Sequence, residues 1–441
     1  MLLRLPAPVA DSHARRPDER TMTRKRAYSQ PLRMGKCLKA PGATGKYDDV
    51  RRLWEDRITG HFLRPHLKGL VEEKKRRGKG LRILDLGCGA GDGLDLIRGV
   101  PGDECAGVDG PWPMLVTDEW LEEYVGIDIN EDLLGQALEW HAGNRKARFV
   151  RADLSDGLPG QIISEHDPFD LYFSSYAMLS HFRDEQCVRI LADICRHAEG
   201  HALFVGDWLG HYSYEWQDLW REPAGPDYFM DYRMSYLYAP SERHSVDIPM
   251  FPLRLMTRDA ILDVVRRASE ATGADVRPLA IFDRSILTGR HTDTLEYNRS
   301  CPQLRSAVNS LFDGKARTDL KRLLVEYVPR EGFDQLNRFF EDFFAASNRL
   351  ITCTMGLLRG DDSSSETSAS VAFARNECLH QSMQALRSVI GGLRSFDCGD
   401  ARASLIEPML GYALQHLEIE LQPGIGAGHS IGAVLDIKTE E

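Results

Sequence analysis

The sequence predicts an α/β protein built on a doubly wound parallel sheet, followed by a mainly helical C-terminal region. Between residues 81 and 286, short apolar segments of strand length alternate with longer segments whose apolar residues recur every three or four positions. Beyond residue 298 this alternation stops and only the helical spacing continues. With 441 residues, the chain has room for two or three domains.

Composition excludes several classes of protein. Hydrophobic residues make up 42% of the chain and charged residues 27%, which is typical of a globular protein. No run reaches the roughly 18 apolar residues that a membrane-spanning helix needs, so we predict no membrane association. The nine cysteines are scattered and form no Cys-x-x-Cys pair, which predicts a reducing, cytoplasmic location, no structural zinc and no metal site.

The charge is unevenly distributed along the chain. Residues 1–46 hold 11 Lys and Arg against 3 Asp and Glu, a net charge of +8, so the remaining residues carry 44 and 63, a net charge of −19. The opening Met-Leu-Leu-Arg-Leu-Pro is too short and too interrupted for a secretory signal. We interpret residues 1–46 as a disordered basic tail, with polyanion binding or organelle targeting as the open alternatives.

The predicted sheet elements follow in order. They are a helix at 47–70, strands at 81–86, 124–129, 147–151, 169–174, 202–206 and 276–286, and helices after the glycine cluster 87–93, after Asn130, at 184–198 and at 257–272. Two segments, about 100–122 and 208–256, interrupt the alternation of strands and helices and are interpreted as insertions. We therefore predict one α/β domain over residues 47–298.

The C-terminal region, residues 299–441, shows mostly helical spacing. Helices are predicted at 303–312, 317–328, 332–358, 371–394 and 402–416, with a polar linker at 361–370. The glycine run Gly424–Gly428 lies within two strand-like segments, so we interpret 417–438 as a hairpin or returning edge strand rather than a phosphate loop.

The glycine cluster after the first strand carries the chemical signal. Absence of a Cβ lets the backbone approach a ligand closely. The cluster does not fit the dinucleotide fingerprint G-x-G-x-x-G, because the last position is Asp92 or Leu94 in the two possible frames. It does not fit the P-loop, because no lysine follows Gly93. What stands there is Asp85-x-Gly87-x-Gly89-x-Gly91.

This spacing resembles the first motif of class I S-adenosylmethionine-dependent methyltransferases, and further elements across residues 47–290 follow in the expected order. The resemblance implies a Rossmann-like methyltransferase sheet with S-adenosyl-L-methionine as cofactor. It assigns Asp85, Gly87, Gly89 and Gly91 to the methionyl side, Asp128 to the ribose hydroxyls and Asp153 to the adenine amine. Ile129 and Leu154, which follow those acids, are also expected to line the cofactor site. The fourth-strand segment Phe169–Tyr176 resembles "FDLVxSxxxLxH" and places Ser174 beside the sulfonium.

Each assignment has an alternative based on packing alone. Asp128 is in position to cap the following helix, but Asn130 is better placed for that role. Two residues after the fourth strand, Tyr176 and His181, are the candidates for catalytic contact with the acceptor. Tyr47 and Trp54 either cover the cofactor or pack within their helix.

The acceptor is not identified by any motif. The insertion holds ten aromatic residues between positions 208 and 238, which indicates either a lid over the acceptor or a small core of its own. Our hypothesis is methyl transfer to an O or N atom of a small molecule. The alternatives are an RNA methyltransferase that uses the basic tail and a non-catalytic S-adenosylmethionine-binding assembly protein. The sequence does not indicate the oligomeric state.

Overall fold

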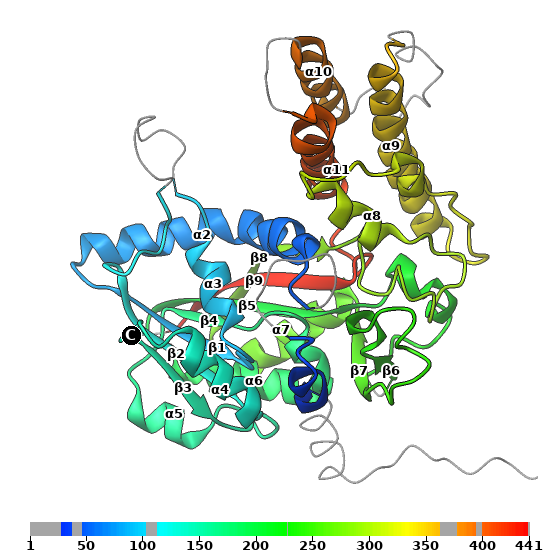
Figure 1. Ribbon diagram of the computed structural model, residues 1–441. Helices are drawn as coiled ribbons and strands as arrows, with labels where there is room; N and C mark the ends of the chain where they lie inside the picture. Colours follow the sequence, from blue (N-terminus) through cyan, green and yellow to red (C-terminus); the bar gives the residue numbers. More distant parts are fainter. Residues whose placement is uncertain are drawn as a thin grey trace, which may run out of the picture.

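The architecture comes from a computed structural model that describes residues 28–37, 46–102, 113–226, 228–361, 377–393 and 399–439 (Figure 1). Most of the predicted tail and linker, and the tip of the first insertion, lie outside the described residues. Residues 28–37, predicted to belong to a disordered tail, instead begin with a helical segment whose Tyr28 contacts His181. None of the described helices is long and apolar enough to span a bilayer.

The predicted doubly wound sheet is confirmed. Its strands are β1 (Leu81–Leu86), β2 (Leu121–Asp128), β3 (Ala147–Arg151), β4 (Leu171–Phe173), β5 (His201–Gly210), β8 (Asp275–Arg284) and β9 (Ser430–Lys438). Strands β3, β2, β1, β4 and β5 lie side by side and parallel. Strand β9 runs antiparallel to both β5 and β8 and lies between them.

Helices cover both faces of this sheet. The α-helices are α2 (Asp56–Arg76), α3 (Asp92–Arg98), α4 (Glu131–Trp140), α5 (Gly160–Glu165), α6 (Asp184–His197), α7 (Arg258–Thr272), α8 (Leu304–Leu311), α9 (Asp334–Leu358), α10 (Glu377–Gly392) and α11 (Glu407–Leu421). Short helical turns are η1 (Arg51–Glu55), η2 (Met178–His181), η3 (Tyr214–Leu219), η4 (Ser235–Leu237), η5 (Leu320–Leu323) and η9 (Arg402–Ile406). Neighbouring strand residues point to opposite faces, so Ile83 packs with α2 and α3 while Leu84 packs with α6 and α7.

In sequence order, the helices of the C-terminal region lie between β8 and β9, the last two strands of the chain. Helices α9, α10 and α11 project together away from the sheet (Figure 1). The chain then returns through Gly424–Gly428, and β9 forms an interior strand rather than an edge strand. The helix predicted at 317–328 is wrong, since only η5 forms there and the chain then leaves the helical conformation before Pro329.

The second insertion adds a hairpin to the end of β5. Its strands β6 (Phe229–Arg233) and β7 (Met250–Met256) pair antiparallel, and β7 pairs with the last two residues of β5. Five of the ten aromatic side chains at positions 208–238 belong to a separate hydrophobic cluster, with Trp216, Tyr232 and Tyr238 buried in it. The interpretation of this insertion as a small core is therefore correct for these residues.

Candidate active site

A pocket opens at the carboxyl ends of β1, β2 and β4, where the strand order reverses between β1 and β4. This reversal is where doubly wound sheets bind ligands. The pocket encloses about 1070 Å³ of space, part of it continuous with solvent. Six of the nine predicted cofactor residues line it: Gly87, Gly89, Asp128, Ile129, Asp153 and Leu154.

The glycine turn is held against the end of β2. The amides of Gly87 and Cys88 both donate to the carbonyl of Ile127, at 2.8 and 2.9 Å. Gly87 has φ of +70°, and a Cβ there would lie 2.2 Å from Met178 Cγ. A Cβ at Gly89, in contrast, would meet no atom closer than 3.9 Å. The turn thus needs glycine at position 87 for its own packing, while Gly89 leaves open space on the pocket side.

Asp128 ties the turn to the second strand. Its Oδ2 accepts the Gly89 amide at 2.9 Å, and its Oδ1 accepts the Asn130 amide at 2.7 Å. Burial raises the pKa of Asp128, and these amide hydrogen bonds oppose the rise. Asn130 caps α4 by accepting the amides of Asp132 and Leu133, as expected. The Asp128 carboxylate is therefore left to line the pocket rather than to cap the helix.

Asp153 sits at the outer end of the pocket. Its side chain is exposed, and its Oδ1 accepts the Ser155 amide at 2.9 Å. The following Leu154 is buried. Together with Ile129, these residues give this end of the pocket an apolar surface with one carboxylate at its rim.

Three predicted cofactor residues do not line the pocket. Asp85 is buried beneath the turn, where the Tyr124 hydroxyl donates to it. Gly91 begins α3 with φ of +79° and packs against His141. Ser174 is fully buried, and its amide donates to the Val205 carbonyl. In this geometry, all three support the shape of the turn and the strand ends from behind.

The two predicted catalytic residues both line the other end of the pocket, but their polar atoms are engaged. The Tyr176 hydroxyl donates to Asp56 Oδ1 at 2.8 Å, and its amide donates to Asp207. Burial raises the pKa of Tyr176 well above its ordinary value, although Arg51 opposes this. His181 Nε2 lies 3.1 Å from the Tyr28 hydroxyl, and its ring stacks on Phe251. Tyr176 therefore presents its ring, not its hydroxyl, to the pocket.

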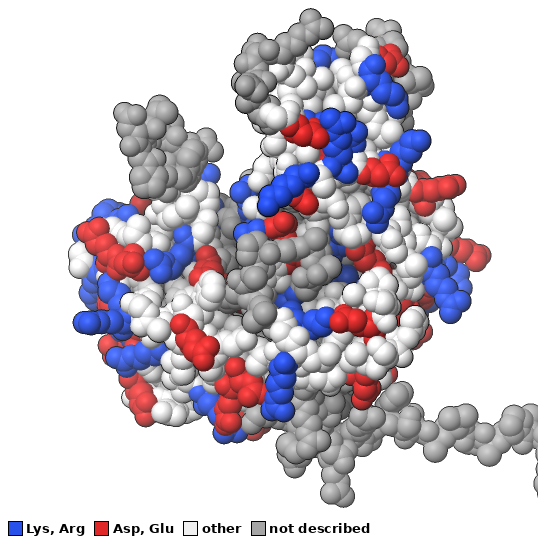
Figure 2. Space-filling model, in the orientation of Figure 1, with Lys and Arg blue, Asp and Glu red and all other residues white. Residues whose placement is uncertain are grey.

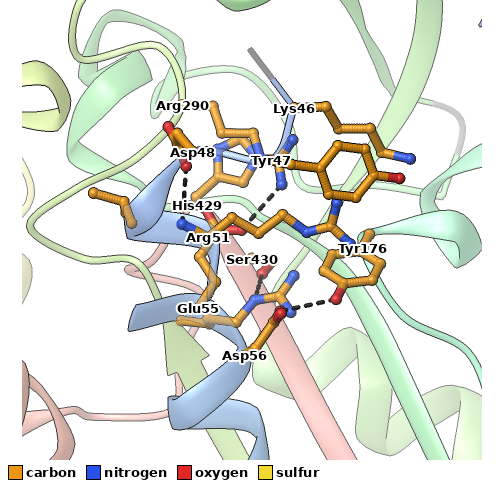
Figure 3. Close-up of polar contacts among 12 residues, drawn as sticks. Lys46, Tyr47, Asp48, Arg51, Glu55, Asp56, Tyr176, Arg290, His429 and Ser430 are labelled. Carbon is orange, nitrogen blue, oxygen red and sulfur yellow. Dashed lines mark hydrogen bonds and ion pairs between the residues drawn. The ribbon is translucent and has the colours of Figure 1, made fainter. Parts of the chain in front are cut away.

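A buried ionic network lies behind this end of the pocket, at the start of the η1–α2 helix (Figure 3). Glu55 pairs with Arg290 at 3.0 Å and with Arg305 at 2.8 Å. Burial by itself would raise the pKa of Glu55, but the two guanidinium groups hold it well below its usual range. Arg305 also binds both oxygens of Asp48, which fixes α8 to the segment that leads into η1.

Arg51 is the most unusual member of this network. Its guanidinium lies between the rings of Tyr47 and Tyr176, 4.4 and 3.9 Å from their centroids (Figure 3). It pairs with Asp92 at 3.2 Å, and its side chain is only 2% exposed. Among the described residues, its Nε and Nη1 have no hydrogen-bond partner. Arg51 does not itself line the pocket, but its partner Asp92 does, so a buried guanidinium with two unpartnered nitrogens lies directly behind the pocket wall.

Several lining residues were missed by sequence reasoning. Asp92 follows Gly91 directly and accepts hydrogen bonds from Tyr47 and Lys46, so its place after the glycine motif was a usable signal. Tyr28, Lys46 and Arg290 come from segments without a motif and reach the pocket only through the fold. Tyr236 belongs to the aromatic insertion and also lines the pocket. The interpretation of the insertion as a lid stays a prediction, and Tyr236 is the residue through which the insertion reaches the pocket wall.

The burial of Trp54 and Cys88 shows what these two side chains do near the site. Trp54 is completely buried, which identifies it as a packing residue. Cys88 is a lining residue of the pocket, but its sulfur lies close to Gly126 of β2. Burial and the nearby Asp85 and Asp128 raise the pKa of its thiol well above the ordinary value. Within the described part of the chain, no group of three or more His, Cys, Asp or Glu residues is arranged to hold a metal ion.

Comparisons with known proteins give one family model and a set of similar solved structures. The model of a family described as "Methyltransferase domain" matches residues 110–200, which include β2, β3 and β4. Similar solved structures include S-adenosylmethionine-dependent methyltransferases from Mesorhizobium loti (18% identity, 51% of this chain, 85% of that chain, TM-score 0.30) and Clostridium acetobutylicum (12%, 58%, 90%, 0.33). A third is magnesium protoporphyrin IX methyltransferase from Synechocystis PCC 6803 (14%, 61%, 94%, 0.33). A search of curated proteins found no match.

Proposed function

We propose that this chain, which carries a methyltransferase domain of the S-adenosylmethionine-dependent family, transfers a methyl group to an O or N atom of a small molecule. The observation that supports this proposal is the single pocket that joins the glycine turn and Asp128 to a second, aromatic and cationic end. The pocket lies at the strand reversal, which is where open α/β sheets bind their ligands.

The residues at the first end fit S-adenosylmethionine. A carboxylate at a strand end accepts two hydrogen bonds from a ribose diol, and Asp128 occupies that position. Gly89 leaves open space beside it, and Asp153 lies at the rim for the adenine amine. When bound, this cofactor supplies a methyl group on a positively charged sulfur. The contribution of the protein is alignment and exclusion of water.

The second end fits a small acceptor rather than a polymer. Its walls include the side chains of Tyr28, Tyr176 and Tyr236 and the cation of Arg290. On the face shown in Figure 2, basic and acidic side chains are interspersed rather than gathered into one basic track. An acidic body would repel a long polyanion.

Calorimetric titration with S-adenosylhomocysteine tests the cofactor assignment. We expect Asp128→Ala to weaken binding by at least tenfold, since each hydrogen bond to a charged group contributes about 1.5–3 kcal/mol. Glu139→Ala on the exposed side of α4 is the matched control. Equal affinity of Asp128→Ala and the wild-type protein would contradict the ribose assignment.

The acceptor class is tested with radiolabelled cofactor and cell extract. Label that moves with small molecules supports the proposal, and label that moves with RNA supports the alternative. The tail variant for this comparison is deletion of residues 1–27, which leaves Tyr28 and Lys46 in the pocket wall. Tight cofactor binding without any transfer would instead favour a non-catalytic role. We also propose a cytoplasmic location, supported by the seven described cysteines, all of which are free thiols.

A further inference from the structure

The turn that follows β4 has an unusual backbone conformation. Tyr176 and Ala177 both have a φ of 59°, and the Met178 amide donates to the Ser175 carbonyl at 3.4 Å to close the turn. Two successive positive φ angles are typical of a type I′ turn, which natural sequences usually build with Asn and Gly. A residue with a Cβ adopts this conformation at a cost in free energy. The turn is therefore strained and needs a restraint from the surrounding structure.

This turn lies between the two ends of the pocket. Ser175, Tyr176 and Met178 all line the pocket. Met178 packs against the glycine turn of the cofactor end, since a Cβ at Gly87 would lie only 2.2 Å from its Cγ. Tyr176 belongs to the acceptor end. The conformation of the turn therefore determines how the two ends of the pocket meet.

Asp207 of β5 supplies a restraint on the turn. Its Oδ2 accepts the Tyr176 amide at 3.0 Å and also pairs with Arg284 Nη2. The Asp207 side chain is only 8% exposed, and it is not among the described residues that line the pocket. Any effect of Asp207 on a bound ligand therefore passes through the residues that it holds.

Arg284, the last residue of β8, fixes Asp207 to the rest of the fold. Its Nε donates to Ser430 Oγ at 2.9 Å, and its Nη1 donates to Thr59 Oγ1 at 3.2 Å. With Nη2 on Asp207, all three nitrogens of the guanidinium have partners. The guanidinium is thus anchored to β9 and α2, and it holds the carboxylate against the turn.

We propose that Asp207, held by Arg284, is a positioning residue of the methyltransferase pocket, because it keeps Tyr176 and Ala177 in the left-handed conformation that aligns the two ends. This inference rests on the proposed function. Without the restraint, the turn relaxes toward ordinary backbone angles and the aligned pocket becomes a minor state. The left-handed conformation is disfavoured by a factor of roughly 5–30 for each residue that has a Cβ. The apparent affinity for a ligand falls with the fraction of protein that is competent to bind it.

The strain in the turn is tested by urea unfolding of two glycine variants. Ala177 and Ala198 are 7% and 8% exposed, but Ala198 has an ordinary φ of −66°. Ala198→Gly should lower the unfolding midpoint, because glycine gains entropy in the unfolded chain. Ala177→Gly should keep the wild-type midpoint or raise it, because glycine adopts a positive φ without strain. An equal fall in both variants would overturn the proposal.

The role of Asp207 is tested by calorimetry with S-adenosylhomocysteine. Asp207→Ala/Arg284→Met removes both partners, so no buried charge is left unpaired, and should weaken binding at least tenfold. Adding Ala177→Gly should restore about fivefold or more, since one of the two strained residues is relieved. The matched control is Lys74→Met/Asp170→Ala, which removes an ion pair at the opposite end of β4 and should leave binding unchanged. Wild-type affinity in the Asp207→Ala/Arg284→Met protein, or no gain from glycine, would overturn the proposal.

A conservative variant separates the hydrogen bond to the turn from the charge of Asp207. Asp207→Asn keeps an oxygen that can accept the Tyr176 amide, so its affinity for S-adenosylhomocysteine should stay within about threefold of the wild-type value. A loss as large as that of the Asp207→Ala/Arg284→Met protein would mean that the charge, not the restraint on the turn, matters for binding. That result would contradict the proposal even if the variant without both side chains failed to fold.

Transfer of label from radiolabelled S-adenosylmethionine to a fixed amount of cell extract gives the final comparison. Bound cofactor favours the aligned turn, so Asp207→Ala/Arg284→Met should raise KM for the cofactor at least tenfold and lower the maximal rate less. A fall in maximal rate at unchanged KM would indicate a general folding defect and refute the role of Asp207. Failure of the wild-type protein to bind S-adenosylhomocysteine would refute the proposed function, while the unfolding midpoints would still test the strained turn.

Discussion

Arg51 offers the sharpest test of how the pocket is divided between cofactor and acceptor. We predict that it binds the carboxylate at the amino-acid end of the cofactor. Its guanidinium bonds to Asp92, which lines the pocket beside Gly87 and Gly89, and its Nε and Nη1 have no partner among the described residues. The perturbation is Arg51→Met, which keeps an unbranched side chain between the two tyrosine rings and removes the charge.

The magnitude follows from the number of free donors. A hydrogen bond to a charged group contributes about 1.5–3 kcal/mol, so losing one such bond weakens binding by roughly 10- to 150-fold. Asp92 itself keeps the Tyr47 hydroxyl at 2.7 Å and Lys46 at 3.3 Å in the variant. The loss should therefore concern the ligand rather than the local fold.

The assay compares two ligands by calorimetry. S-adenosylhomocysteine carries the amino-acid end, and 5′-methylthioadenosine has the same adenosine part without it. Arg51→Met should weaken the first ligand by the stated factor and leave the second unchanged, so the preference between them should disappear. An unchanged preference would refute the reasoning and assign the free donors of Arg51 to the acceptor instead.

Three other predictions concern the fold around the pocket. Gly87→Ala should abolish S-adenosylhomocysteine binding in calorimetry, because the new Cβ lies 2.2 Å from Met178 Cγ at a φ of +70°, whereas Gly135→Ala in α4 has open space and should preserve binding. Burial raises the pKa of Glu418 to about 7, so the folded state holds this proton more tightly than the unfolded state. The contribution of Glu418 to the free energy of unfolding is therefore full below about pH 4.5 and falls by about 3 kcal/mol as the pH rises to 7. Urea unfolding should show Glu418→Gln gaining stability relative to wild type over that range, and a constant difference would contradict it. Asp283→Ala should destabilise the protein by about 3 kcal/mol or more in the same assay, because three backbone amides of the Gly424–Gly428 loop donate to this carboxylate, and an equal unfolding midpoint would exclude that role.

The site residues that could be predicted from the sequence are those that lie next to the end of a predicted strand. Gly87 and Gly89 come just after β1, and Asp128 is the last residue of β2. Parallel strands bring their carboxyl ends together whatever the rest of the chain does. Asp85 and Ser174 carry the same local signal but lie behind the strand ends, because alternate residues of a strand point to opposite faces.

The acceptor end could not be predicted in the same way. Tyr28, Lys46 and Arg290 lie far apart in the sequence, and no short-range spacing relates them. The glycine loop Gly424–Gly428, predicted to be a hairpin or returning edge strand rather than a phosphate loop, uses its amides within the fold. Its amides already bind an anion of the chain itself, the carboxylate of Asp283.

Strand β9 shows why the helical region is not an independent appendage. A chain ended at residue 298 would lack the strand that joins β5 to β8, which leaves two long strand edges unpaired in the middle of the sheet. The region also binds the helix that carries Arg51, since Arg305 holds Asp48 and Gln415 donates to the carbonyls of Leu53 and Trp54. Its folding is therefore coupled to the wall of the pocket, and α8 and α11 act as supports for the η1–α2 helix that carries Arg51.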